Sequence, residues 1–173
     1  SIIFYILIYT IWLKRRTHHN IVIGGAAGAF PPVIGWVCVT GELSLYPMLL
    51  FLTIFFWTPP HFWALSLYKD VEYSKANIPM LPVVKGQKET KQQILIYSLI
   101  LFFVSLLPYY YGFAKEQFLV FGILINLIFL LFSYRILVCD NNNTEKKASE
   151  LFKFSILYLY FYFSYLFFFN YIL

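Results

Sequence analysis

Two carboxylates stand close together near the middle of the chain, at Asp70 and Glu72. Residues two apart do not share a helix face, but in a turn both carboxylates can reach one ion. Hard divalent cations such as Mg²⁺ are held by one or two carboxylates together with substrate phosphates. The spacing is therefore compatible with a magnesium site. It is equally compatible with an ordinary solvated loop, and the two interpretations stay open on these residues alone.

Basic residues occur where a phosphate ligand could use them. Lys69 directly precedes Asp70, and Lys14 and Arg15 follow an apolar segment that contains Tyr9. Cationic side chains neutralise phosphate oxygens and so stabilise a phosphate leaving group. The same cations also suit a purely topological role at the ends of membrane helices.

A single histidine lies inside a long apolar run. His61 follows Pro59 and Pro60. It could be a polar residue at a helix kink, a general base or an axial haem ligand, and the sequence does not decide between these roles. His18 and His19 lie in a polar segment and are more typical of a surface loop.

The elements that position these residues are apolar helices. Apolar residues make up 61% of the 173 residues, with 20 Phe and 15 Tyr, and the mean hydropathy is +0.71. A soluble domain of this size could not keep so many aromatic side chains out of water, so lipid is the expected solvent. A membrane-spanning helix needs about 17–25 apolar residues. Five uncharged runs meet that requirement, namely 21–39, 43–68, 92–114, 118–134 and 154–173.

A sixth uncharged run, residues 1–13, is too short to span a membrane and is expected to be the end of a further helix. The predicted fold class is therefore all-α. It is a polytopic transmembrane helix bundle with five complete spans plus the end of a sixth.

The distribution of charge accounts for the net charge of +5. If the runs alternate across the membrane, 12 of the 13 Lys and Arg fall on one side and only Lys115 falls on the other. This is the positive-inside pattern. It predicts that segments 14–20, 68–91 and 135–153 face the cytoplasm or its organellar equivalent. The expected partner is a lipid bilayer, and no nucleic acid is expected.

Prolines interrupt two of the predicted spans, at Pro31-Pro32 and at Pro59-Pro60. Each proline removes a backbone donor and crowds the carbonyl four residues earlier. In lipid, a carbonyl freed in this way needs a partner within the protein or in a watery cavity. The two interruptions fit either kinked packing or a pair of helices that line a central pocket. The connection 69–91 is expected to be a long loop.

Several long runs together resemble one known family. They are Tyr9–Thr17, Asn20–Trp36 with its Gly-Gly-Ala-Ala-Gly-Ala-Phe-Pro-Pro segment, Trp57–Tyr68 with Thr-Pro-Pro-His-Phe-Trp, and Tyr73–Gly86 with Asn-Ile-Pro-Met-Leu-Pro. These runs are similar to those of the protohaem IX farnesyltransferases, also called haem O synthases. That family belongs to the UbiA superfamily of membrane prenyltransferases. The resemblance is strongest over residues 9–93.

The resemblance implies a nine-helix bundle around a cavity that opens to the cytoplasmic side. It implies transfer of a farnesyl group from farnesyl diphosphate to a vinyl group of haem B, which gives haem O and diphosphate. It also implies Mg²⁺ held by two acidic motifs. Residues 1–173 would form a single transmembrane prenyltransferase domain, truncated at its N-terminus. The family's first acidic motif, Asn-x-x-x-Asp, does not occur in the chain, so the chain is expected to be inactive by itself.

The resemblance also assigns roles to particular residues. Glu72 stands directly before Tyr73, where the family usually has Asp. The implied site consists of Glu72 and Asp70 as catalytic metal ligands, Lys14, Arg15, Lys69 and Tyr9 as diphosphate-binding residues, and His61 facing haem B.

Two alternatives stand beside this assignment. One is another UbiA-type prenyltransferase with a different aromatic acceptor, such as a hydroxybenzoate. The other is a non-enzymatic polytopic membrane protein or transporter, because kinked helices and an intramembrane histidine suit that class as well. Heavy use of Phe, Tyr, Ile, Asn and Lys suggests an AT-rich genome. The expected location is a bacterial inner membrane, with the mitochondrial inner membrane as second choice.

Overall fold

The computed structural model describes residues 20–69 and 80–171, and every regular element in these ranges is helical. The elements in chain order are α1 (Asn20–Ala29), α2 (Pro31–Thr40), α3 (Leu45–Tyr68), α5 (Leu81–Tyr110), α6 (Glu116–Val138), the 3₁₀ turn η2 (Asn141–Asn143) and α7 (Thr144–Tyr171). Five helical units are long and apolar enough to cross a membrane, with α1 and α2 together forming the first. The predicted all-α bundle of five spans is confirmed.

The two proline pairs have different effects on their helices. Pro31 and Pro32 occupy the first positions of α2, where a missing N–H costs nothing. Phe30 joins α1 to α2 with helical backbone angles, and its carbonyl accepts the Ile34 N–H at 3.0 Å. Pro59 and Pro60 lie inside α3, which continues past them without ending. Only the first pair therefore separates two helices.

The helices at the charged end of the bundle are longer than the uncharged runs. α5 begins at Leu81 and not near Gln92, and α7 begins at Thr144 and not near Phe154. A helix can project beyond the lipid. Charged residues in the projecting part end the apolar run but do not end the helix. The expectation of a loop throughout 69–91 is therefore wrong for residues 81–91.

A sharp bend divides α5 near its start. Gly86 has φ 83° and ψ 167°, a conformation that is essentially restricted to glycine. Its carbonyl accepts the Thr90 hydroxyl at 2.9 Å. The bend separates the first turn of α5 from the long helix that follows. Met80 and Leu81, on the near side of the bend, are buried in the main core.

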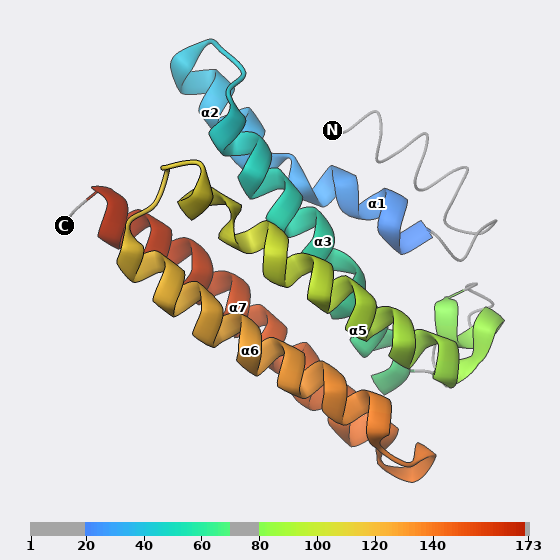
Figure 1. The fold of residues 1–173 in the computed structure, drawn as a ribbon. Coiled ribbons are helices and arrows are strands. Elements are labelled where there is room, and N and C mark those ends of the chain that lie inside the picture. The colour runs from blue at the N-terminus through green and yellow to red at the C-terminus, as the bar shows by residue number, and fades with distance from the viewer. Residues whose placement is uncertain (1–19, 70–79, 172–173) are drawn as a thin grey trace.

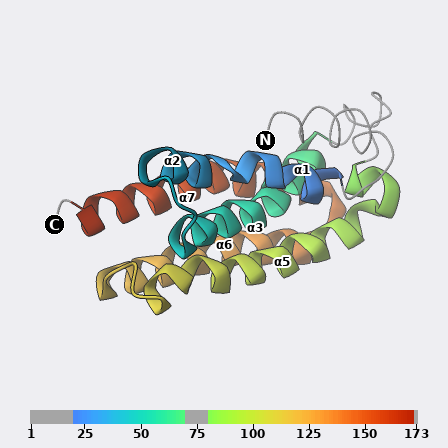
Figure 2. The ribbon, with the colours of Figure 1, turned by 90° about the horizontal axis from the view of Figure 1, so that it is seen from above.

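Four helices form a closed ring. α3 packs against α5, α5 against α6, α6 against α7, and α7 against α3. α1 and α2 pack on α3 from outside the ring. Figures 1 and 2 show α1 and α2 on one side of α3, with α5 on the other side.

Because successive spans run in opposite directions, the basic residues gather at one end of the bundle. The C-terminal ends of α3 and α6 lie beside the starts of α5 and α7, at the right of Figure 1. We call this region the basic end. Among the described residues it holds eight of the nine Lys and Arg, namely Lys69, Lys85, Lys88, Lys91, Arg135, Lys146, Lys147 and Lys153. Lys115, which precedes α6, lies at the opposite end.

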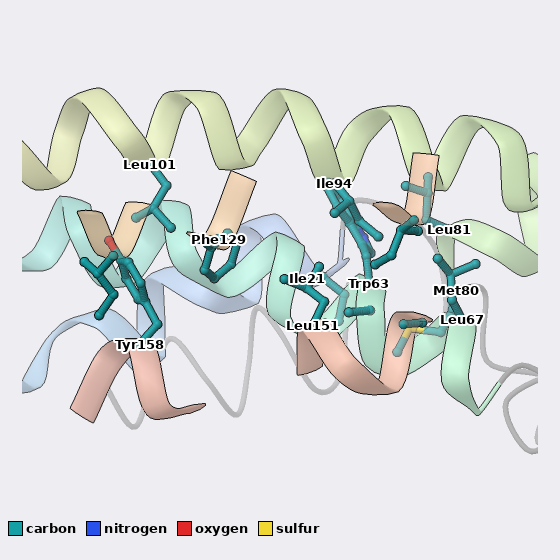
Figure 3. Close-up of a cluster of buried hydrophobic side chains, with 14 residues drawn as sticks. Ile21, Trp63, Leu67, Met80, Leu81, Ile94, Leu101, Phe129, Leu151 and Tyr158 are labelled. Carbon is teal, nitrogen blue, oxygen red and sulfur yellow. The ribbon is translucent and has the colours of Figure 1, made fainter. Parts of the chain in front are cut away.

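The core of the ring is apolar and aromatic, with embedded polar contacts. Ile94, Leu101, Phe129 and Leu151 lie within one cluster of buried side chains (Figure 3). Asn126 is also buried, and its side-chain amide donates to Ser105 Oγ at 2.8 Å and to Gly122 O at 2.7 Å. Its carbonyl oxygen accepts the Tyr158 hydroxyl at 3.0 Å. This network joins α5, α6 and α7 inside the bundle.

Candidate functional site

Most of the predicted site residues lie outside the described part of the chain. Tyr9, Lys14 and Arg15 fall within residues 1–19, and Asp70 and Glu72 fall within residues 70–79. Their roles stay predictions. The structure describes His61 and Lys69, both at the C-terminal half of α3 or directly after it.

His61 is held in the contact between α3 and α7. It is 8% exposed, and its Nδ1 lies 2.6 Å from Ser155 Oγ. The imidazole stacks on Trp57 at a centroid distance of 4.3 Å and on Phe152 at 4.8 Å. Trp57 Nε1–H donates to the Ser155 carbonyl at 2.9 Å. Two aromatic faces and one hydrogen bond therefore fix the ring's orientation.

The hydrogen bonds around Ser155 assign the proton on the imidazole. Ser155 Oγ donates to the Phe152 carbonyl at 2.6 Å, which uses the one hydrogen of the hydroxyl. His61 Nδ1–H is then the donor to Ser155 Oγ, and Nε2 carries a lone pair. A neutral imidazole oriented through one nitrogen is the form that ligates a metal or accepts a proton through the other.

A cavity of about 300 Å³ lies between α1 and α3, beside this histidine. Its lining consists of Ile21, Gly24, Gly25, Gly28, Ile54, Trp57, Thr58 and Phe62. Trp57 and Phe62 both contact the His61 ring, at centroid distances of 4.3 and 5.0 Å. His61 itself is not in the cavity lining and lies behind these two aromatic residues.

Small residues on α1 create this cavity. A Cβ on Gly25 would stand 2.9 Å from Thr58 Cγ2, whereas a Cβ on Gly28 would meet nothing within 4 Å. α1 therefore approaches α3 closely at Gly25 and leaves open space at Gly28. Small residues allow two helices to approach closely, and at Gly25 the partner in this close approach is Thr58.

Lys69 directly follows the last turn of α3, and its backbone N–H donates to the Leu65 carbonyl at 2.8 Å. Its ammonium lies over the Tyr68 ring, 5.2 Å from the centroid. Tyr68 in turn lines a second cavity, of about 420 Å³, at the basic end. The other residues that line it are Asn142, Glu145, Lys146, Ser149, Glu150 and Lys153.

The sequence interpretation did not identify this second cavity. The one sequence feature that could have indicated it was the cluster of Lys and Glu at 145–153, but such a cluster is equally typical of a solvated helix end. Only the pairing of the end of α3 with the start of α7 turns the cluster into a cavity wall.

No group of three or more His, Cys, Asp or Glu side chains that could hold a metal ion occurs within residues 20–69 and 80–171. The two carboxylates predicted to bind Mg²⁺ lie in the segment between these ranges. The magnesium site therefore remains a prediction based on Asp70 and Glu72. Cys38 and Cys139 are both free. Cys38 lies near the C-terminal end of α2, and Cys139 directly follows α6, at the basic end.

The sequence pattern of the UbiA prenyltransferase family matches residues 1–170. Three curated relatives, each named "Protoheme IX farnesyltransferase", are similar to the chain. The relative from Parvibaculum lavamentivorans is 53% identical over 167 residues, which are 96% of this chain and 52% of the relative. The relative from Acidiphilium cryptum is 54% identical over 166 residues, 92% of this chain and 52% of the relative. The relative from Pelagibacter ubique is 52% identical over 161 residues, which are 92% of this chain and 53% of the relative.

The chain thus spans about half the length of the curated relatives it matches. No solved structure matches it.

Proposed function

The chain belongs to the UbiA prenyltransferase family, and on that premise we propose that it takes part in transferring a farnesyl group from farnesyl diphosphate to a vinyl group of haem B. The product is haem O, and the reaction belongs to haem biosynthesis for terminal oxidases. The observation that carries this proposal is an identity of 52–54% over at least 92% of the chain to proteins named for that activity.

The reaction divides into three chemical events. The allylic C–O bond of farnesyl diphosphate breaks, the diphosphate leaves with the bonding electrons, and a carbocation-like farnesyl group remains. The vinyl π electrons of haem B then form the new C–C bond. The positive charge moves to the vinyl carbon next to the macrocycle, where water supplies a hydroxyl and releases a proton. Aromatic side chains stabilise cations of this kind.

The residues we assign to the leaving group lie at the basic end or belong to segments predicted to adjoin it. Lys69 is the described member, and Lys14, Arg15 and Tyr9 complete the proposed diphosphate-binding set. Cations at this end of the bundle oppose the charge that develops as the C–O bond breaks.

Glu72 and Asp70 are the proposed metal ligands. Bound Mg²⁺ would neutralise diphosphate oxygens, because it prefers carboxylates together with substrate phosphates.

His61 is our proposed contact to haem B. Its unprotonated Nε2 and its ordered ring support this role. The ring is covered by Trp57 and Phe152, so a haem contact requires Trp57 or Phe152 to move aside when the acceptor binds.

Release of diphosphate tests the reaction class. Membranes that contain the complete product of the gene are incubated with farnesyl diphosphate, haem B and Mg²⁺. We expect diphosphate release only when both substrates and the metal are present. A transporter would instead move a solute without releasing diphosphate, and that outcome would contradict the proposal.

The metal assignment has a matched control. Glu72→Gln removes one proposed ligand charge, and we expect a loss of roughly 100-fold or more in rate, as for other groups that stabilise developing charge. Glu145→Gln removes an exposed carboxylate from α7 and should leave the rate unchanged. Equal rates for both variants would remove Glu72 from the site.

We also propose a bacterial inner membrane as the location, with the mitochondrial inner membrane as the alternative. The basic end would face the cytoplasm, because 12 of the 13 Lys and Arg are assigned to that side. The relatives that support this choice come from bacteria.

A further inference from the structure

The cavity between α3 and α7 at the basic end has no role in the proposed reaction. Its volume of about 420 Å³ falls within the range of small-molecule pockets, roughly 300–1,000 Å³. Polar groups line it, including Tyr68, Asn142 and Ser149. What such a cavity binds depends on which of its charged groups are already paired.

The carboxylate of Glu150 is already paired. It accepts the Lys147 ammonium at 3.0 and 3.1 Å, and Arg135 approaches it at 3.4 Å. Within the described ranges, neither Lys146 nor Lys153 lies within ion-pair distance of a carboxylate. The lining also contains Glu145, which takes part in neither of the two ion pairs of Glu150. Outside these ion pairs the cavity therefore presents two cations and one carboxylate, so positive charge is in excess.

Lys146 is also placed against the field of its own helix. It lies in the first turn of α7, which begins at Thr144. A helix N-terminus carries partial positive charge and favours anions, which makes a lysine there electrostatically unfavourable. Glu145, directly before Lys146 in the same turn, offsets part of this effect. An anion in the cavity would be attracted by both the lysine and the helix end.

The depth of the cavity matches the surface of a membrane. Lys153 is followed on α7 by exposed apolar side chains, among them Ile156, Leu157 and Tyr160. No charged residue follows Lys153 in the sequence. Lys153 therefore marks the level where the helix passes from hydrocarbon to headgroups, and the cavity opens at that level.

From these contacts we propose that the cavity binds the phosphate headgroup of an anionic phospholipid. Lys146 and Lys153 contact the phosphate, and the Tyr68 and Ser149 hydroxyls donate to its oxygens or to the attached alcohol. The acyl chains descend along the apolar face of α7 below Lys153. The site adjoins Lys69 through Tyr68, but it is argued from the cavity's own residues and stands even if the farnesyl-transfer proposal fails.

Native mass spectrometry of the purified, complete gene product tests this site. Phosphatidylglycerol and phosphatidylcholine are added separately, and the affinity for the first bound lipid is measured for each. We expect phosphatidylglycerol to bind more tightly than phosphatidylcholine. A basic residue near an anionic headgroup contributes about fivefold in affinity. The double variant Lys146→Gln/Lys153→Gln should therefore weaken phosphatidylglycerol binding roughly 25-fold.

Two further variants make the test specific. Lys85→Gln/Lys88→Gln removes two exposed lysines from the same end but outside the cavity, and should keep the wild-type affinity. Ser149→Phe fills the cavity without changing charge, and should weaken phosphatidylglycerol binding as well. This variant keeps the test valid if the double lysine variant does not fold.

Three outcomes of the lipid measurements would overturn the proposal. They are equal affinity for the two lipids, unchanged binding in both cavity variants, or an equal loss in the control variant. Inorganic phosphate separates the two sources of a phosphate group. If it displaces phosphatidylglycerol at a concentration matched to the lipid, the cavity is a site for free phosphate and the lipid assignment is wrong.

Discussion

The contact between Gly25 and Thr58 allows a quantitative test of how α1 seats on α3. In Gly25→Ala the new Cβ would stand 2.9 Å from Thr58 Cγ2 and 3.1 Å from Thr58 Cβ. Thr58 cannot turn away freely, because its hydroxyl donates to the Ile54 carbonyl at 2.8 Å and its χ1 is restricted by branching. The helices must move apart, and overpacking of this kind costs about 1–3 kcal/mol.

Gly28→Ala is the matched control on the same helix. Its Cβ would meet nothing within 4 Å, so only the helix propensity changes. Alanine is favoured over glycine by about 1 kcal/mol in a helix. Because both variants gain this propensity, the difference between them isolates the contact with Thr58. We expect Gly25→Ala to be less stable than Gly28→Ala by about 1–3 kcal/mol.

Thermal unfolding in one detergent, followed by tryptophan fluorescence, measures this difference. For a chain of this size about 1 kcal/mol corresponds to 2–4 °C, so the two melting temperatures should differ by roughly 2–12 °C. Adding Thr58→Ser to Gly25→Ala removes Cγ2 and should restore most of the loss. If the two glycine variants melt together, or if Thr58→Ser gives no recovery, α1 does not pack on α3 through Gly25.

Three further results are expected from other parts of the bundle. Asn126→Leu should lower the free energy of unfolding by about 1–3 kcal/mol, because it leaves the buried Tyr158 hydroxyl without its acceptor. Adding Tyr158→Phe should lower it little further, and additive losses in unfolding experiments would refute the pairing. Gly86→Ala should destabilise the chain by about 1–3 kcal/mol because alanine avoids φ 83°, ψ 167°; an unchanged melting temperature would contradict the bend. A membrane-impermeant maleimide applied from the outer side should label Cys38 and not Cys139, and the reverse result would invert the topology.

The sequence was sufficient for the number and type of membrane spans, because an uncharged run of about 20 residues has few alternatives to a membrane helix. The sequence was insufficient to predict where α5 and α7 begin at the basic end. α5 extends to Leu81 and α7 to Thr144, past several lysines. Lysines at these depths reach water with their long side chains, so they limit the apolar run without limiting the helix.

The polar network inside the ring could not be predicted for a different reason. Asn126, Ser105 and Tyr158 belong to three helices, and their contact depends on the rotation of each helix about its axis. A sequence shows which residues share a face of one helix. It does not show how three helices are rotated and shifted relative to one another. The same limit applies to the cavity that joins Tyr68 on α3 with Lys153 on α7.

His61 illustrates what the sequence and the structure each contribute to the site. The sequence identified it as an unusual polar residue beside a proline pair, with three possible roles. The structure supplies its partners, Ser155, Trp57 and Phe152, and with them the tautomer. Ser155 and Phe152 lie on α7, more than 90 residues away in the sequence, so no local pattern could have identified them. Only Trp57 is a local partner, on α3 itself.

The identity of the acceptor tests the central claim most directly. The complete gene product is incubated in membranes with farnesyl diphosphate and Mg²⁺, and haem B and 4-hydroxybenzoate are supplied in separate reactions. The porphyrin and aromatic products are then analysed by mass spectrometry. We predict that haem B gains one farnesyl group and the elements of one hydroxyl, and that 4-hydroxybenzoate stays unmodified. Farnesylated hydroxybenzoate with unchanged haem B would contradict the account and assign the chain to a different branch of its family.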